Sequence, residues 1–124
     1  DYMIISTLSI DAKIKDDRFL DLTKESKNIN DFIYIISNMD VIITADTSTY
    51  HISDAFMIPT ITIFTDSDYL KKIKYYKYVK PIFIEDKSKN LSKFVYENDS
   101  LTINKFESWN KLKVNKIIKL LDTF

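Results

Sequence analysis

The sequence predicts an α/β domain, a Rossmann-like three-layer arrangement with a mostly parallel sheet. Short β-branched runs, of which 41–44 and 60–64 are the clearest, alternate with segments of helical periodicity. Such alternation is typical of a parallel sheet covered by helices on both faces. The link between these two runs also has the length of a helical crossover between parallel strands. We expect residues 1–124 to form one domain of this kind, which is a usual size for a single domain.

The first part of the chain carries two expected strands and one expected helix. Residues 2–7 are an apolar run of strand length, and residues 19–22 are predicted to be a short buried strand. Residues 28–38 place isoleucine and phenylalanine at near-helical spacing, which predicts a helix. Asn28 or Asn30 is the expected cap at the start of that helix.

The second part continues the same alternation. Strands are predicted at 41–44 and 60–64, and a helix of two turns is predicted at 49–56. A further strand is predicted at 81–84. Residues 109–121 are predicted to be one amphipathic helix, with leucines and isoleucine on one side and solvated lysines on the other. Its apolar residues are Leu112, Ile117, Leu120 and Leu121, and its lysines are Lys111, Lys113, Lys116 and Lys119.

Composition excludes several classes of function. Lys+Arg and Asp+Glu are both 18, and this balance argues against non-specific binding of nucleic acid, which depends on excess positive charge. Cysteine is absent, so thiolate metal sites and cysteine nucleophiles are excluded, and the one histidine cannot form a multi-histidine metal site. Glycine is also absent, which excludes the glycine-rich phosphate loops as they are usually written. We expect no bound metal and no nucleic-acid partner.

The most informative stretch follows the strand at 41–44 and reads Asp-Thr-Ser-Thr-Tyr-His over residues 46–51. It lies where a strand ends and a helix begins, and ligands of open α/β sheets bind at the carboxyl ends of the strands. The first N–H groups of a helix have no partner within it and can hold a phosphate. The competing interpretation is that these residues are ordinary helix caps.

Residues 39–64 resemble the donor-site segment of heptosyltransferase-like glycosyltransferases, glycosyltransferase family nine. The shared pattern is a strand, then Asp46-Thr47-Ser48-x-x-His51, a helix, a proline and a second strand. The segment also resembles glycosyltransferase-like domains that follow tetratricopeptide repeats. Upstream, Leu20-Asp21-Leu22-Thr23 is similar to another family segment, so the resemblance covers roughly residues 18–66, about half of the chain.

The resemblance implies the C-terminal, donor-binding half of a GT-B fold. Asp46 would contact the donor sugar, and Thr47, Ser48 and Thr49 would hold the diphosphate of a nucleotide sugar such as ADP-heptose. His51 would lie near the phosphates or order the loop. Transfer would invert the anomeric centre without a metal. The base would come from an N-terminal domain, so this chain is expected to hold no catalytic base and to be inactive alone.

Three positions depart from the family pattern. Met57 stands at the turn before the proline, where the family has glycine, and a left-handed backbone there would strain methionine. Asp54 replaces a small apolar residue within the helix. Phe64-Thr65-Asp66-Ser67 replaces a glycine-containing turn after the second strand, which removes a close backbone approach to ligand.

Other polar clusters carry weaker signals. Asp66 follows the strand at 60–64 and is a candidate donor contact, although Asp66-Ser67-Asp68 is more typical of a cap for a helix beginning near Tyr69. The three aspartates at 11, 16 and 17 lack a defined metal-ligand spacing and predict a solvated loop. Lys71–Lys80 is a dense basic stretch with interleaved tyrosines. It predicts contact with anionic lipid headgroups, with a phosphate-rich glycolipid acceptor or with single-stranded nucleic acid. The competing interpretation is a solvated helix face with tyrosines that pack on the sheet.

The sequence therefore favours the donor-binding half of an inverting, metal-independent glycosyltransferase. Its acceptor would be a surface glycan, a lipid-linked glycan or a protein. We expect a cytoplasmic location, peripheral to the inner membrane, and a chain that is part of a longer protein. The first alternative is a degenerate transferase-like domain with a binding or assembly role and no catalysis. The second is another GT-B-like enzyme, such as a nucleotide-sugar epimerase.

Overall fold

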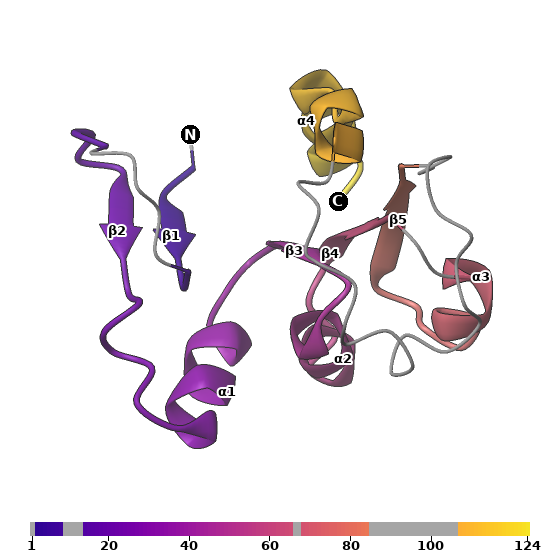
Figure 1. Ribbon diagram of the computed structural model, residues 1–124. Coiled ribbons are helices and arrows are strands. Elements are labelled where there is room, and N and C mark those ends of the chain that lie inside the picture. Colours follow the sequence, from indigo (N-terminus) through magenta and orange to yellow (C-terminus); the bar gives the residue numbers. More distant parts are fainter. Residues whose placement is uncertain (1, 9–13, 66–67, 85–106) are drawn as a thin grey trace, which may run out of the picture. The chain divides into compact units, whose positions relative to one another are not determined.

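The strands form two parallel sheets, and each sheet belongs to a different unit of the chain. The computed structural model describes residues 2–8, 14–65, 68–84 and 107–124 (Figure 1). The chain divides into two compact units, Asp1–Asn38 and Met39–Phe124. Parallel strands with helices in the connections between them confirm the predicted α/β class.

The first unit contains β1 (Ile4–Ser6), β2 (Phe19–Asp21) and α1 (Ile29–Ser37). The two strands pair in parallel, with Ile4 opposite Phe19. Asn28, one of the two predicted candidates, is the cap of α1, because its side-chain oxygen accepts hydrogen bonds from the N–H groups of Asn30 and Asp31. These two bonds satisfy donors that a helix leaves without a partner at its start.

The prediction that the strand at 19–22 is buried is wrong. Leu20 is 45% exposed, and Asp21 beside it is also exposed. Within the described residues β2 has one neighbouring strand, β1. An apolar strand is buried only where another layer covers it, and strand character alone does not ensure that cover. Of the three loop aspartates, Asp11 lies outside the described residues, and Asp16 pairs with Arg18 at 2.9 Å.

The second unit is built on a three-stranded parallel sheet in the order β3-β4-β5. Its strands are β3 (Ile42–Ala45), β4 (Thr60–Phe64) and β5 (Val79–Phe83). The crossovers contain α2 (Ser48–Ala55) and α3 (Tyr69–Lys72). The strand predicted at 81–84 thus begins two residues earlier than expected. Pro81 lies in an edge strand, where its missing N–H is tolerated.

Helices cover both faces of this sheet, so the unit has the predicted three layers (Figure 1). Side chains alternate between the faces along β4, whose five residues are all buried. Ile61 and Ile63 pack with Ile82 and Ile84 against α4 (Val114–Leu121). On the other face, Phe64 and Val79 pack against Tyr50 of α2 and against Tyr69, Ile73 and Tyr76.

The single helix predicted at 109–121 is two helices in the structure. A 3-10 helix, η2 (Glu107–Lys111), is followed by α4, which begins at Val114 after an extended Lys113. Leu112 and Ile117 both pack against the isoleucine face of the sheet. In a continuous helix these two residues would point about 140° apart, since each residue turns the helix by about 100°. The break lets both side chains reach the core.

Candidate functional site

The start of α2 lies directly after the carboxyl end of β3, as predicted from the sequence. Thr47 is the N-cap, and its side-chain oxygen accepts a hydrogen bond from the N–H of Thr49 at 3.3 Å. The hydroxyl of Thr47 also lies 3.2 Å from that of Thr44 and 3.1 Å from that of Thr49. Ser48 occupies the first helical position, where the N–H group has no acceptor one turn earlier within the helix. The cap and the hydroxyl chain fix the direction of this helix start.

Asp46 is held by side chains from two different helices. The ammonium nitrogen of Lys72, at the end of α3, lies 2.5 Å from Asp46 Oδ2. The side chain of Tyr50, in the first turn of α2, is hydrogen-bonded to the same residue. Asp46 is mostly shielded, with 22% of its side chain exposed. The Asp46 carboxylate is therefore fixed at the sheet edge. Its ion pair places the ammonium group of Lys72 near the start of α2.

Tyr50 connects this site to the hydrophobic core. The residue is 1% exposed, and its ring packs edge-on against Phe64 at a centroid distance of 5.6 Å. Burial raises the pKa of the Tyr50 hydroxyl, and the nearby Asp46 carboxylate raises this pKa further. Tyr50 therefore keeps its proton and donates it in the hydrogen bond to Asp46.

His51 lies one residue further along α2 and is exposed. Its Nδ1 atom is hydrogen-bonded to the hydroxyl of Tyr76, which lies in the connection between α3 and β5. Its ring also lies 4.0 Å from the ring of Tyr50, centroid to centroid. In this structure His51 thus links α2 to the segment that follows α3.

Lys72 is the site residue that sequence analysis missed, because it was placed only in the basic stretch Lys71–Lys80. The available signal was topological. α3 follows β4 as α2 follows β3, so both helices begin at the same edge of the parallel sheet. Asp66 lies outside the described residues.

The prediction that the side chain of Asp68 caps α3 is wrong. This residue is the N-cap by position but makes no capping hydrogen bond with its side chain. Its carboxylate instead pairs with Lys71 at 2.8 Å. This hydrogen bond with Lys71 lowers the pKa of the Asp68 carboxyl group. The ion pair with Lys71 thus takes the place of a capping hydrogen bond from the Asp68 side chain.

Two of the departures from the family pattern have structural explanations. Met57 has φ of 60°, which is the left-handed conformation that was expected to strain a methionine at this position. The N–H of Met57 donates to Asp54 O and that of Ile58 donates to Ser53 O, the pair of bonds that closes a helix in a Schellman motif. The Asp54 carboxylate accepts hydrogen bonds from the N–H groups of Lys77 and Tyr78, at 3.0 and 2.9 Å. Asp54 therefore anchors the turn before β5.

The fold and site together define an α/β domain with a polar, charged helix start beyond a parallel strand, an arrangement common to proteins that bind nucleotides. The sequence profile of glycosyltransferase family 9 (heptosyltransferase) matches residues 25–101, which is more than half of the chain. The chain belongs to this family. No curated protein and no solved structure matches it.

Family membership indicates glycosyltransferase activity in general, with a nucleotide-sugar donor and an acceptor as substrates. The matched residues include Asp46, the start of α2, Lys72 and Asp66, and they end before η2. No helix in the described part of the chain has both the length and the apolar character needed to cross a bilayer. The described residues also contain no group of three or more histidine, aspartate or glutamate side chains placed to hold a metal ion.

Proposed function

We propose that the second unit binds the nucleotide-sugar donor of an inverting, metal-independent glycosyltransferase. The observation that carries this proposal is the position of Asp46, held by Lys72 and Tyr50 beside the start of α2. The diphosphate of the donor would bind at the N–H groups of the first turn, and Asp46 would accept a hydrogen bond from a sugar hydroxyl. ADP-heptose or a similar nucleotide sugar fits this arrangement.

The proposed chemical role of the site is to stabilise the leaving group. Negative charge develops on the diphosphate as the bond to the sugar breaks, and positive groups that are already in place lower the energy of that state. The start of α2 contributes the positive end of its dipole. Lys72 contributes a full charge within 2.5 Å of Asp46. The base that activates the acceptor would be supplied by an N-terminal domain, and no further cofactor is proposed.

The proposed surroundings are the cytoplasm and the periphery of the inner membrane, with a glycan, a lipid-linked glycan or a protein as acceptor. The proposed membrane contact lies in the basic stretch Lys71–Lys80, where two of the lysines have carboxylate partners. Lys71 pairs with Asp68, and Lys72 pairs with Asp46. The proposal for this stretch therefore rests on Lys74 and Lys77, which are both exposed.

A matched pair of variants at Ser48 tests the phosphate site. Proline is well tolerated at the first helical position, so Ser48→Pro removes one N–H group while the helix persists. Ser48→Ala removes the hydroxyl but keeps the N–H group. We expect calorimetric titration to show that one of ADP, UDP, GDP or ADP-heptose binds the chain, that Ser48→Pro weakens binding about tenfold, and that Ser48→Ala changes it less. Equal binding by both variants would place the diphosphate elsewhere.

Asp46→Asn tests the proposed contact with the sugar. Asparagine retains a side-chain oxygen that can accept the hydrogen bond from Tyr50, so the core is disturbed less than by alanine. We expect this variant to lose the additional affinity that ADP-heptose has over ADP, with ADP binding kept. If the variant and the original chain show the same difference in affinity between ADP-heptose and ADP, Asp46 does not contact the sugar.

The alternative function, a degenerate domain without catalysis, is favoured by one observation: Asp46 already has internal partners in Lys72 and Tyr50. If this alternative holds, the folded chain binds none of the nucleotides. Glycosyl transfer by the protein with its N-terminal half would then also be absent, and assembly would be unaffected by Asp46→Asn. Nucleotide binding or transfer that Asp46→Asn weakens excludes this alternative.

A further inference from the structure

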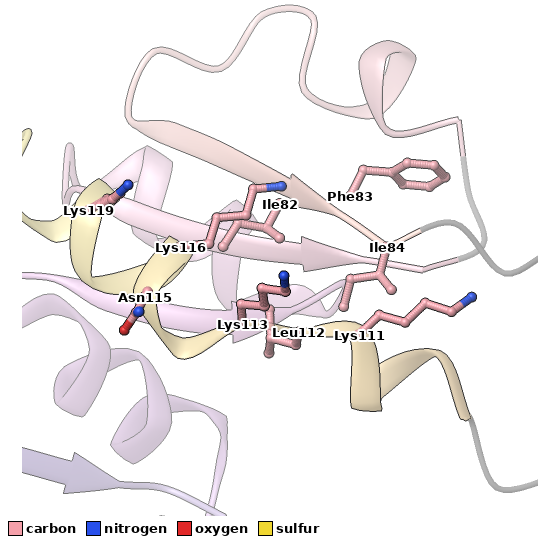
Figure 2. Close-up of a pocket in the computed structure, with 9 residues that line it drawn as sticks. All are labelled: Ile82, Phe83, Ile84, Lys111, Leu112, Lys113, Asn115, Lys116 and Lys119. Carbon is pink, nitrogen blue, oxygen red and sulfur yellow. The ribbon is translucent and has the colours of Figure 1, made fainter.

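A concave site lies on the face of the sheet opposite Tyr50. An open cavity of about 660 Å³ is formed where β5 ends and where η2 and α4 lie (Figure 2). Its aliphatic residues are Leu112, which is half-buried, and Ile82 and Ile84, which belong to the hydrophobic core and are 1% and 5% exposed. The lining residues from η2 and α4 lie after the segment that matches the family.

The charged residues that line this cavity, within the described part of the chain, are all lysines. They are Lys111, Lys113, Lys116 and Lys119. Figure 2 labels these lysines along η2, the link that follows it and α4. The whole chain has equal numbers of basic and acidic residues, so this concentration of one sign is local. Ammonium groups gathered in a concave site create a positive potential that attracts anions.

The beginning of α4 adds to this potential. Lys113 is the N-cap residue of α4, and its side chain makes no capping hydrogen bond. The first N–H groups of a helix carry partial positive charge, which a capping oxygen would usually offset. Lys113 and Lys116 lie three residues apart around this start, and both side chains are exposed. An anionic oxygen between these two ammonium groups would interact with both.

We propose that this cavity binds an amphiphilic phosphate, an organic phosphate with an aliphatic chain. The phosphate group lies between Lys113 and Lys116, and the chain packs against Leu112 and the aliphatic stems of the lysine side chains. These apolar contacts distinguish the proposed ligand from inorganic phosphate, which has no aliphatic chain to make them. The lysines set it apart from a neutral lipid, which has no charge for them to bind. The site is separate from the proposed donor site and does not depend on it.

Trp109 provides a direct reporter of binding. It is the one tryptophan of the chain, it lies in η2 two residues before Lys111, and it is partly exposed. The test is a titration of the chain with octyl phosphate below its micelle concentration, followed by tryptophan emission and by calorimetry. We expect saturable binding that tightens from butyl to hexyl to octyl phosphate. Inorganic phosphate and octanol, used as separate probes, should bind at least about tenfold more weakly.

Matched lysine variants locate the site. Lys113→Gln with Lys116→Gln should weaken octyl phosphate binding by about tenfold or more. The control, Lys24→Gln with Lys27→Gln, removes the same charge from exposed residues that have the same spacing and do not line the cavity, and it should leave binding unchanged. Circular dichroism confirms that both double variants are folded, which is expected because all four lysines are exposed.

Several outcomes would overturn the proposal. Equal affinity for inorganic and octyl phosphate would show a site for anions alone, and equal affinity for octanol would show an apolar site alone. Equal losses in the two double variants would show an effect of net charge. Competition by ADP would place octyl phosphate in the donor site. Failure of nucleotide binding with intact octyl phosphate binding would reject the proposed function and leave this inference standing.

Discussion

The two faces of the β3-β4-β5 sheet are built from different chemistry. The face under α4 is aliphatic, with isoleucines from β4 and β5 against leucines and isoleucine of the C-terminal segment. The face under α2 and α3 is largely aromatic, with Tyr50 and Phe64 buried against Tyr69 and Tyr76. Tyr50 is part of the core, since it is 1% exposed, and it also holds the candidate site through its hydrogen bond to Asp46. On the aromatic face, core packing and the positioning of the candidate site therefore depend on the same residue.

The largest expected effect comes from the aliphatic face and concerns stability alone. Ile82→Ala removes buried methyl groups from a residue that is 1% exposed. We expect the free energy of unfolding to fall by about 3 kcal/mol, because such truncations leave a cavity. Denaturant titration measures this loss. Where the variant is folded, its nucleotide affinity should equal that of the original chain, and a reduced affinity would contradict the separation of the two faces.

Tyr50→Phe, on the aromatic face, should affect stability and ligand binding together. It keeps the ring and removes the hydroxyl that is hydrogen-bonded to Asp46. We expect a loss of about 1.5 kcal/mol in the free energy of unfolding, in the range for hydrogen bonds to charged groups. We also expect weaker binding of the donor, since Asp46 loses one of the groups that hold it. Calorimetry on the same samples decides whether the two losses occur together.

Tyr50→Phe and the original chain should also differ in how their free energy of unfolding changes at alkaline pH. The folded pKa of Tyr50 is raised above its usual value near 10 by burial and by Asp46. Above pH 10 the unfolded chain loses this proton while the folded chain keeps it, so the free energy of unfolding falls as pH rises. Tyr50→Phe should lose less stability between pH 9 and pH 11 than the original chain. Equal losses would show that Tyr50 does not titrate differently in the two states.

Thr62→Val tests whether a buried hydroxyl group in β4 destabilises the fold. Thr62 is 0% exposed, and its hydroxyl oxygen has no hydrogen-bond partner among the described residues. An unsatisfied buried hydroxyl is destabilising, and valine has nearly the same shape without the polar atom. We expect Thr62→Val to raise the free energy of unfolding by about 1 kcal/mol, measured by denaturant titration. A decrease would show that the hydroxyl has a partner in solution.

Met57→Gly should give the smallest effect, also a stabilisation. Met57 has φ of 60°, where a side chain is unfavourable and glycine is not. We expect the free energy of unfolding to rise by about 0.7 kcal/mol, since relief of the side-chain strain is partly offset by the greater freedom of glycine in the unfolded chain. The control Met57→Ala keeps the Cβ atom and should give no such gain. Thermal unfolding of the two variants makes the comparison.

Local patterns were sufficient to predict most elements of the chain. The bounds of β4 at 60–64 agree with the prediction, and the cap of α1 by Asn28 is confirmed. Errors occurred where packing overrides local preference. Leu112 breaks the C-terminal helix because both it and Ile117 reach one core. Leu20 is exposed although its segment is apolar, because strand character does not show what covers a strand.

The sequence by itself determined the parallel α/β alternation, a helix start soon after the strand at 41–44, and the strain that a left-handed backbone places on Met57. These depend on side-chain periodicity, capping and backbone sterics over a few neighbouring residues. Only the tertiary structure decided that Lys72 meets Asp46, 26 residues earlier, and that the lysines of α4 lie beside the end of β5. Such contacts depend on the register of parallel strands, which brings the ends of distant segments to one edge of a sheet.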